Sequence, residues 1–267
     1  MPEPRETNRR AWDQRARQQL AHAQPATEED FRNPWPIVDD CGWLEGRVAG
    51  RRVLCLAAGG GKHGVLFASV GAHVTVVDLS AGMLDLDRQA AARRGLKLNT
   101  VEASMDDLSA LPGAAFDVVI QPVSTCYVPD LAVVYREVAR VTAADGLYIA
   151  QHKQPAALQA DAAPGAHGYV MREPYYRTGP LPALLGEHGH RESGMVEFLH
   201  RWDELIGVLC RSGFVVEDLV EPRHGRAHAE TGSFAHRSFY LPPFVTIKAR
   251  RTRQAGEGAC SRLIVPA

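Results

Sequence analysis

Early in the chain, apolar and polar positions follow the order of a strand, a loop, a helix and a second strand. Residues 53–56 form a short apolar run with the length of a buried parallel strand, and the glycine cluster 59–61 follows it. A helix-like segment over 62–70 comes next, and a second apolar strand over 73–77 leads to Asp78. This order predicts a right-handed βαβ unit, with a ligand crevice at the carboxyl ends of its strands.

The alternation of strands and helices continues towards the end of the chain. Ser80 is a good cap for a helix over 81–94, and one apolar face marks a further helix that begins at Asp130. Strands are expected at 116–121, 147–150, 214–219 and 238–249, and another helix with an apolar face at 202–210. We expect the last strand at the edge of the sheet, because Pro242 and Pro243 cannot donate hydrogen bonds to a neighbour.

Two segments lie outside this regular pattern. Residues 8–24 have a helix-forming composition but only a thin apolar stripe, so a helix there needs a partner surface. Residues 151–200 are rich in Pro, Gly, His and Tyr without periodicity. They follow the carboxyl end of a strand, where they could form one wall of a substrate pocket. We therefore expect an N-terminal helical extension over 1–46, one domain over 47–250 and a disordered tail over 251–267.

Composition narrows the classes of protein. A chain of 267 residues suits one large α/β domain, and a formal net charge of -1 offers no basic field to a nucleic acid. No run of about 18 apolar residues occurs, and the N-terminus lacks the apolar core of a signal peptide, which predicts a cytoplasmic protein without a membrane partner. Five cysteines without a CxxC pair argue against a disulfide framework. A monomer and a homodimer are both compatible with this composition.

The glycine cluster permits two ligands. Gly59, Gly61 and Gly64 match the dinucleotide pattern, and Asp78 lies 19 residues after Gly59, where a ribose-binding acid is expected. That interpretation predicts an NAD(P)-dependent Rossmann oxidoreductase. The same glycines also suit S-adenosylmethionine, whose ribose hydroxyls would donate to the acid at the end of the second strand. The βαβ unit alone leaves both ligands open.

Residues 52–83 resemble motif I of the class I S-adenosylmethionine-dependent methyltransferases, and the likeness continues in order over 50–150. VVDLSAGML is similar to the second motif, VEASMDDLSALP to the adenine loop, FDVVIQPVSTCYV to the fourth strand and GLYIAQHKQP to the fifth. The resemblance implies a Rossmann-like, seven-stranded and mostly parallel sheet with helices on both faces and an antiparallel last strand. It also implies a small-molecule acceptor, as in the enzymes of ubiquinone and menaquinone biosynthesis.

The resemblance also assigns roles to individual positions. Asp78 would bind the ribose, Leu79 and Met83 would line the adenine pocket, and Lys62 could pair with the carboxylate of S-adenosylmethionine at a helix N-terminus. The full set of expected cofactor-binding residues is Ala57, Gly59, Gly61, Lys62, Asp78, Leu79, Met83, Ser104, Met105, Asp106 and Gln121.

Three positions depart from the family pattern. Cys55 stands where the first strand usually carries an acid, Ala57 replaces the customary first glycine, and Ser104 replaces the acid of the adenine loop. Because a thiol cannot replace a carboxylate, the backbone carbonyls of Ala57 and Gln121 are expected to take over part of its task. These departures also leave open a catalytically inactive protein that only binds S-adenosylmethionine.

Methyl transfer from a sulfonium is an in-line displacement, so the acceptor's lone pair must be held about 3 Å from the methyl carbon. A hydroxyl acceptor benefits from a base, and His200 is our first candidate because it precedes a predicted helix beside Arg201. Tyr127 and His152 are the other catalytic candidates. No third ligand accompanies the closest histidine pairs, so no metal is expected. The Tyr, His and Arg content of 151–200 favours a polar or anionic aromatic acceptor over a long isoprenoid.

Overall fold

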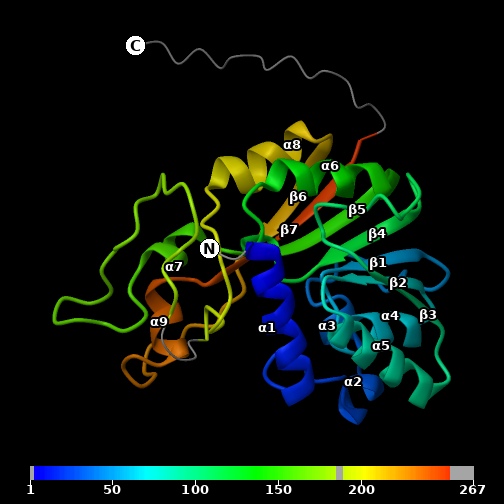
Figure 1. Ribbon diagram of the computed structural model, residues 1–267, viewed down its shortest axis with the longest axis horizontal. Helices are drawn as coiled ribbons and strands as arrows, with labels where there is room; N and C mark the ends of the chain where they lie inside the picture. Colours follow the sequence, from blue (N-terminus) through cyan, green and yellow to red (C-terminus); the bar gives the residue numbers. More distant parts are fainter. Residues whose placement is uncertain (1–2, 185–188, 253–267) are drawn as a thin grey trace.

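A computed structural model describes residues 3–184 and 189–252, which form one sheet between two layers of helices (Figure 1). The strands are β1 (Arg52–Leu56), β2 (His73–Asp78), β3 (Leu98–Glu102), β4 (Phe116–Gln121), β5 (Thr142–Lys153), β6 (Phe214–Val220) and β7 (Phe244–Arg251). The helices are α1 (Pro4–Gln18), α2 (Glu28–Arg32), α3 (Trp35–Val38), α4 (His63–Ser69), α5 (Ala81–Arg94), η1 (Thr125–Tyr127), α6 (Leu131–Val141), α7 (Pro155–Gln159), η2 (Asp203–Val208), α8 (Leu209–Arg211) and α9 (Phe234–Tyr240). Most of the expected tail, from residue 253 onward, lies outside the described residues.

The seven strands lie in the order β3-β2-β1-β4-β5-β7-β6. β1 to β5 are parallel to one another, and β7 runs antiparallel to both of its neighbours. The predicted fold, with its antiparallel last strand, is confirmed. β1 and β4 are neighbours in the sheet, and the chain continues from β1 to β2 on one side and from β4 to β5 on the other. The carboxyl ends of β1 and β4 therefore mark the topological switch point, where ligands bind in such sheets.

The predicted βαβ unit is present at the centre of the sheet. β1 pairs with β2 from Arg52 opposite His73 to Leu56 opposite Val77. α4 packs close to the sheet at Gly64, where an added Cβ would lie 2.4 Å from a side-chain atom of Val76. Only a glycine at position 64 permits so close an approach of α4 to β2.

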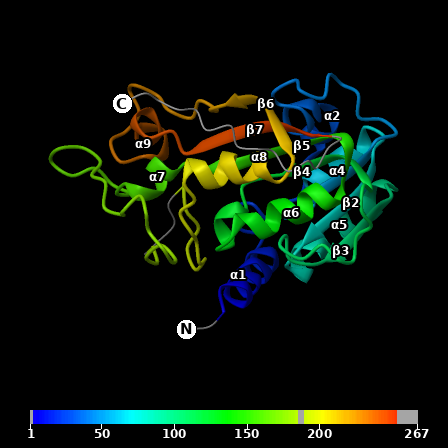
Figure 2. The ribbon, with the colours of Figure 1, turned by 90° about the horizontal axis from the view of Figure 1, so that it is seen from above.

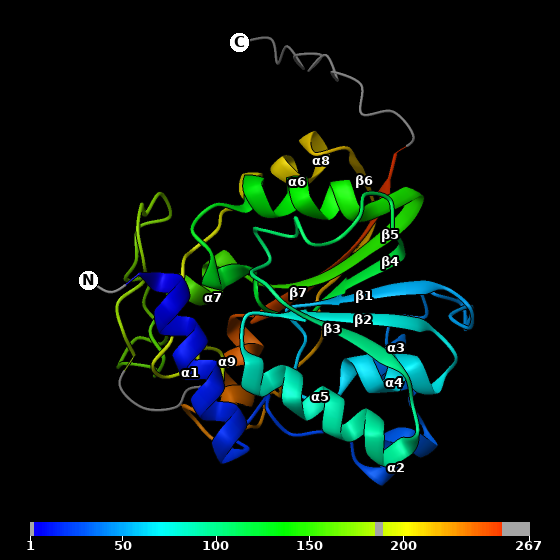
Figure 3. The same ribbon diagram turned by 45° about the vertical axis from the view of Figure 1, so that its right-hand side comes forward.

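Helices bury the two faces of the sheet separately. α6, η2 and α8 cover one face, and α3, α4 and α5 cover the other (Figures 2 and 3). On the first face Tyr135 and Tyr148 are fully buried, with their rings edge to face at a centroid distance of 6.1 Å. The hydroxyl of Tyr135 donates to the carbonyl of Leu205 at 3.1 Å, so η2 is tied to α6 as well as packed on it.

The C-terminal part of the sheet differs from the prediction. Residues 234–240 form helix α9, whose cap Ser233 accepts a hydrogen bond from the backbone of His236, and β7 begins only at Phe244. β7 lies between β5 and β6, so the predicted start at 238 and the predicted edge position are both wrong. The prolines 242–243 lie in the connection before the strand, where they remove no hydrogen bond from the sheet.

The N-terminal extension contains α1, which begins and ends earlier than the expected 8–24. Pro4 occupies its first turn, where a missing N–H is tolerated, and Gln19 ends it in a left-handed conformation with φ of 50°. The helix lies across the carboxyl ends of the parallel strands (Figures 1 and 3). In the described part of the chain, no helix has both the length and the apolar character needed to span a bilayer.

Candidate active site

A cavity of about 520 Å³ opens at the carboxyl ends of the parallel strands, beneath α1. The loops after β1, β2, β3 and β4 supply most of its walls. Of the expected cofactor-binding residues, those that line it are Ala57, Gly59, Lys62, Asp78, Leu79, Met83, Ser104, Met105 and Asp106. Gly61 and Gln121 lie behind its walls in the described structure.

Asp78 ends β2 at the bottom of the cavity. Its Oδ2 accepts a hydrogen bond from the N–H of Gly59, and its Oδ1 accepts one from the N–H of Ser80, both at 2.9 Å. Burial raises the pKa of Asp78 to about 6, although these backbone donors favour the carboxylate. Each oxygen has a second lone pair, so the side chain can still accept hydrogen bonds from the two hydroxyls of a ribose.

The glycine loop approaches Asp78 too closely for any other residue type. A Cβ at Gly59 would lie 2.8 Å from the Cβ of Met83 and 2.9 Å from Oδ2 of Asp78. Gly60 and Gly61 have φ of 119° and 76°, which residues with a Cβ rarely adopt. The loop therefore offers bare backbone to the cavity.

Asp87 is a site residue that the sequence analysis missed. It is fully buried in α5, and its Oδ2 accepts a hydrogen bond from the N–H of Gly60 at 2.9 Å. Burial raises its pKa to about 7. Cys55 is buried close enough for the Asp87 charge to affect its thiol, so the acid beneath the glycine loop comes from α5 instead of β1. A signal existed, because Asp87 lies on the apolar face of its helix, one turn after Met83.

The cavity wall at Met105 is supported from behind. Gln121 is buried, its amide donates to Ser124 Oγ at 3.0 Å, and its carbonyl accepts from Tyr148 Oη at 2.6 Å. Its amide nitrogen also lies 3.3 Å from the sulfur of Met105. The side chain of Gln121 therefore holds the wall in place and does not enter the cavity.

Charged residues at the cavity rim are paired within the protein. Asp106 Oδ2 accepts from Arg5 at 2.9 Å, which links the adenine loop to α1. Lys62 Nζ lies 3.5 Å from Asp30, and its side chain is 40% exposed. Lys62 therefore stays accessible to a further anion at the start of α4.

Tyr127 is the one catalytic candidate that lines the cavity in the described structure. It lies in η1, just after β4, and its hydroxyl donates to Oε2 of Glu192 at 2.8 Å. The ring of Trp12 from α1 contacts it edge to face at a centroid distance of 5.9 Å. Glu192 was not among the expected residues, because the aperiodic insertion gave no signal for it.

His200 and His152 lie beneath the cavity instead of in it. His200 Nε2 donates to the carbonyls of Thr125, at 3.1 Å, and Val128, at 3.0 Å. His152 is fully buried, its Nδ1 shares a hydrogen bond of 2.8 Å with Thr125 Oγ1, and burial lowers its pKa to about 3. Both histidines hold the segment that carries Tyr127, so this geometry gives no support to the expectation that either acts as the base.

Gly189 and Glu192 from the insertion after β5 line the cavity, together with Gln151 near the end of β5 and Phe244 from the start of β7. Residues 3–184 and 189–252 contain no group of three His, Cys, Asp or Glu side chains placed to hold a metal ion.

Sequence comparison finds methyltransferases among the relatives of this chain. Residues 54–150 match the model of a methyltransferase domain. An uncharacterized methyltransferase of Bacillus subtilis, YbaJ, is 31% identical over 231 residues, which cover 82% of this chain and 90% of the relative. A ubiquinone biosynthesis O-methyltransferase of Xanthomonas euvesicatoria is 30% identical over 185 residues, which cover 67% of this chain and 71% of the relative.

Solved structures give the same result. An S-adenosylmethionine-dependent methyltransferase from Mesorhizobium loti superposes with a TM-score of 0.61 at 26% identity, over 79% of this chain and 97% of that one. Its class of cofactor agrees with the wall residues around Asp78 and the glycine loop. With these likenesses, the strand order and the cavity at the switch point, the chain belongs to the class I S-adenosylmethionine-dependent methyltransferases.

Proposed function

We propose that this enzyme methylates a small molecule bound in the same cavity as S-adenosylmethionine. The observation that carries the proposal is one continuous cavity of about 520 Å³, which extends from Asp78 on β2 to Gln151 on β5. Small-molecule sites measure about 300–1,000 Å³. Since one cavity in the lower half of that range must hold both ligands, a compact acceptor fits better than a long isoprenoid. The name of the Xanthomonas relative, a ubiquinone biosynthesis O-methyltransferase, supports a small-molecule acceptor, and it makes isoprenoid-tailed quinols the alternative against which a compact acceptor must be tested.

The residues over β1 to β3 are proposed to hold the cofactor. Asp78 accepts hydrogen bonds from the ribose, Leu79 and Met83 pack on the adenine, and the loop 104–106 borders its edge. Lys62 can pair with the cofactor's carboxylate. Asp87 supports the glycine loop from below, since its carboxylate accepts a hydrogen bond from Gly60.

The residues over β4 and β5 are proposed to hold the acceptor. When bound, S-adenosylmethionine supplies an electrophilic methyl group: the acceptor's lone pair forms the new bond, and the electrons of the broken C–S bond remain on sulfur. Trp12, Tyr127 and Phe244 provide aromatic walls for the acceptor, and Gln151 provides a polar one. α1 covers this end of the cavity and excludes water from the reacting groups.

Titration of the product S-adenosylhomocysteine tests the cofactor site. We expect Asp78→Ala to weaken binding by about tenfold or more, because hydrogen bonds to a carboxylate are worth about 1.5–3 kcal/mol. Asp117→Ala is the matched control, since Asp117 pairs with Arg52 at the opposite end of the strands. Equal affinity in wild type and Asp78→Ala would overturn the assignment.

Transfer of a tritiated methyl group tests the acceptor class. Compact polar aromatics and isoprenoid-tailed quinols would be offered to the purified enzyme together with labelled S-adenosylmethionine. We expect label in the compact compounds. Turnover confined to the lipid-tailed compounds would contradict the compact acceptor but leave the cofactor assignment in place.

A further inference from the structure

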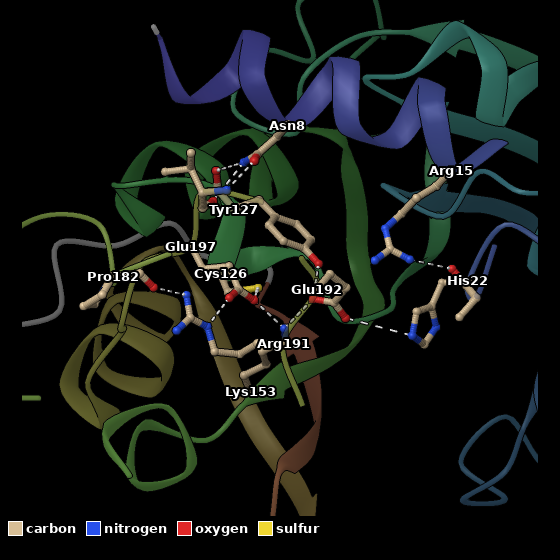
Figure 4. Close-up of polar contacts among 12 residues, drawn as sticks. Asn8, Arg15, His22, Cys126, Tyr127, Lys153, Pro182, Arg191, Glu192 and Glu197 are labelled. Carbon is tan, nitrogen blue, oxygen red and sulfur yellow. Dashed lines mark hydrogen bonds and ion pairs between the residues drawn. The ribbon is translucent and has the colours of Figure 1, made fainter. Parts of the chain in front are cut away.

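Glu192 lies at the end of the cavity away from the ribose site. It lines the cavity beside Tyr127, which follows β4, and it contacts Lys153, the last residue of β5 (Figure 4). Asp78 ends β2, and β1 and β4 lie between β2 and β5 in the sheet. Glu192 therefore stands over the half of the sheet where we place the acceptor.

The two oxygens of Glu192 have different surroundings. Oε2 accepts hydrogen bonds from Lys153 Nζ at 2.6 Å and from Tyr127 Oη at 2.8 Å. Oε1 accepts no hydrogen bond from a described residue, and the ring nitrogen Nε2 of His22 lies 3.9 Å from it. The His22 side chain is 65% exposed, whereas that of Glu192 is 13% exposed. One carboxylate oxygen is thus fixed by the protein, and the other is available to a ligand.

Buried charges fix Glu192 in the ionised state. Lys153, whose side chain is 2% exposed, lies between Glu192 and Glu197, and Arg191 pairs with the other oxygen of Glu197. Burial alone raises the pKa of the Glu192 carboxyl, but the charge of Lys153 and the hydrogen bonds from Lys153 and Tyr127 lower it to about 2. The thiol of Cys126 also faces this cluster but carries no charge, because burial raises its pKa.

The ionised Oε1 of Glu192 in the cavity wall favours ligands that carry a hydrogen-bond donor. A largely buried carboxylate oxygen without a donor loses the hydration it would have in water, and a ligand N–H or O–H restores a charge-assisted hydrogen bond. An anionic ligand group at the same place would be repelled. The cavity end around Glu192 and Tyr127 therefore fits a donor group.

We propose that Glu192 binds the acceptor, with Oε1 taking a hydrogen bond from the N–H or O–H of the atom to be methylated. The acceptor is then an amine or a hydroxyl compound, and its nucleophilic atom is not part of a carboxylate or a phosphate. Tyr127 and Lys153 act as positioning residues that keep Oε2 occupied and Oε1 turned to the cavity. This inference rests on the proposed function, because it needs both ligands in one cavity.

Sinefungin is a suitable probe, since a carbon that bears an amine replaces the sulfonium and its methyl group. The amine points where the methyl group would point, towards the acceptor. Binding of sinefungin and S-adenosylhomocysteine would be measured by calorimetry in wild type and in Glu192→Gln. We expect Glu192→Gln to weaken sinefungin by about tenfold, because the attraction of the ammonium group to the Glu192 carboxylate through an intervening water is lost, and to leave S-adenosylhomocysteine unchanged.

Glu3→Gln is the matched control, because Glu3 also lines the cavity but lies before α1. It should leave the ratio of the two affinities as in wild type. A crystal structure of the wild-type sinefungin complex gives a second measurement that does not depend on a variant's folding. The amine is expected to point towards Oε1 from about 5 Å, because the atom to be methylated would lie between them, with a water molecule in its place.

The outcomes separate this inference from the proposed function. If S-adenosylhomocysteine binds and Glu192→Gln leaves the sinefungin affinity unchanged, or the amine lies away from Oε1, Glu192 is not the acceptor site. Preferential methylation of a carboxylate or phosphate oxygen would also overturn it. If neither compound binds the wild type, the proposed function fails, and this inference fails with it.

Discussion

Two buried aspartates hold the glycine loop from different elements. Asp78 on β2 accepts from Gly59, and Asp87 on α5 accepts from Gly60. The pKa of each is raised by burial, to about 6 for Asp78 and about 7 for Asp87. Both carboxyls thus change their protonation state at pH values at which binding and stability can be measured. Protonation of Asp78 affects cofactor binding, and protonation of Asp87 affects the stability of the fold.

The first consequence is a pH-dependent affinity for the cofactor. A protonated Asp78 is a weaker acceptor for ribose hydroxyls, so affinity for S-adenosylhomocysteine should fall as the pH drops below about 6, by at most about tenfold per pH unit. Calorimetry between pH about 5 and about 8 would measure this in wild type and in Asp78→Asn. We expect weaker binding by the variant and a smaller pH dependence. The same slope in both proteins would show that another group is responsible.

The second consequence concerns the stability contributed by Asp87. Its pKa is higher in the folded protein than in the unfolded chain, so between about pH 4 and pH 7 the folded state binds more protons. The free energy of unfolding therefore loses the Asp87 contribution as the pH rises through about 7. Asp87→Asn cannot titrate, so the variant should gain stability relative to wild type over this window, by at most about 1.4 kcal/mol per pH unit.

Urea denaturation of both proteins at several pH values would measure the difference between them, in which the contributions of the other titrating groups cancel. A difference independent of pH would mean that Asp87 titrates elsewhere. Asp85→Asn is the control, because it changes an exposed carboxyl on the same helix. Leu86→Gln would not serve, because it disturbs the packing of a buried side chain.

α1 is held to the domain by polar contacts as well as by apolar packing. Asn8 is buried: its amide donates to the carbonyls of Tyr127, at 3.3 Å, and Val196, at 3.0 Å, and its oxygen accepts from the N–H of Val196 at 2.8 Å. Asp13 accepts from Ser80 Oγ at 2.6 Å, at the start of α5. These contacts explain how a helix with a thin apolar stripe covers the cavity.

We expect Asn8→Ala to loosen α1 without unfolding the sheet. The substitution leaves buried backbone groups of Tyr127 and Val196 without their partner, which costs about 1–3 kcal/mol. Hydrogen exchange would show faster exchange in α1 and unchanged rates in β1 and β4. Gln14→Ala is the control, because it removes an exposed amide from the same helix. Equal protection of α1 in Asn8→Ala and wild type would contradict this role.

Elements with local signals could be predicted, and those that depend on distant contacts could not. The apolar run 53–56, the glycine loop and the cap Ser80 gave β1, its turn and α5 correctly. α9 was missed because strand-like residues follow Ser233, although that serine caps a helix. The expected helix at 202–210 is present but begins with a π turn over Asp203–Val208, which no periodicity of the sequence marks.

The candidate site divides in the same way. Its proposed cofactor half follows from short motifs, because one loop and one strand end bring Gly59 and Asp78 together. Its proposed acceptor half joins Tyr127, Lys153 and Glu192, which are separated by up to 65 residues. Their contact depends on how the aperiodic insertion folds back over β5, and neither the spacing nor the residue types determine that path.

The sheet order places both halves of the site in one folding unit. Residues after β1, β2, β3 and β4 line the cavity together with α1 and the insertion, so the ligand contacts most of the chain's length. A ligand bound there opposes the separation of these elements. Binding must therefore raise the stability of the whole domain, and not only order one loop.

We expect saturating S-adenosylhomocysteine to raise the melting temperature by about 5–10 °C. A ligand at about 100 times its Kd adds about 2.7 kcal/mol, and for a domain of this size each kcal/mol corresponds to about 2–4 °C. Differential scanning calorimetry would measure the shift in wild type, in Asp78→Ala at the same ligand concentration, and in wild type with NAD. The shift should shrink in the variant and be absent with NAD, because the family's cofactor is an adenosyl sulfonium. An equal shift with NAD would contradict the cofactor assignment, and an equal shift in Asp78→Ala would place the ribose elsewhere in the cavity.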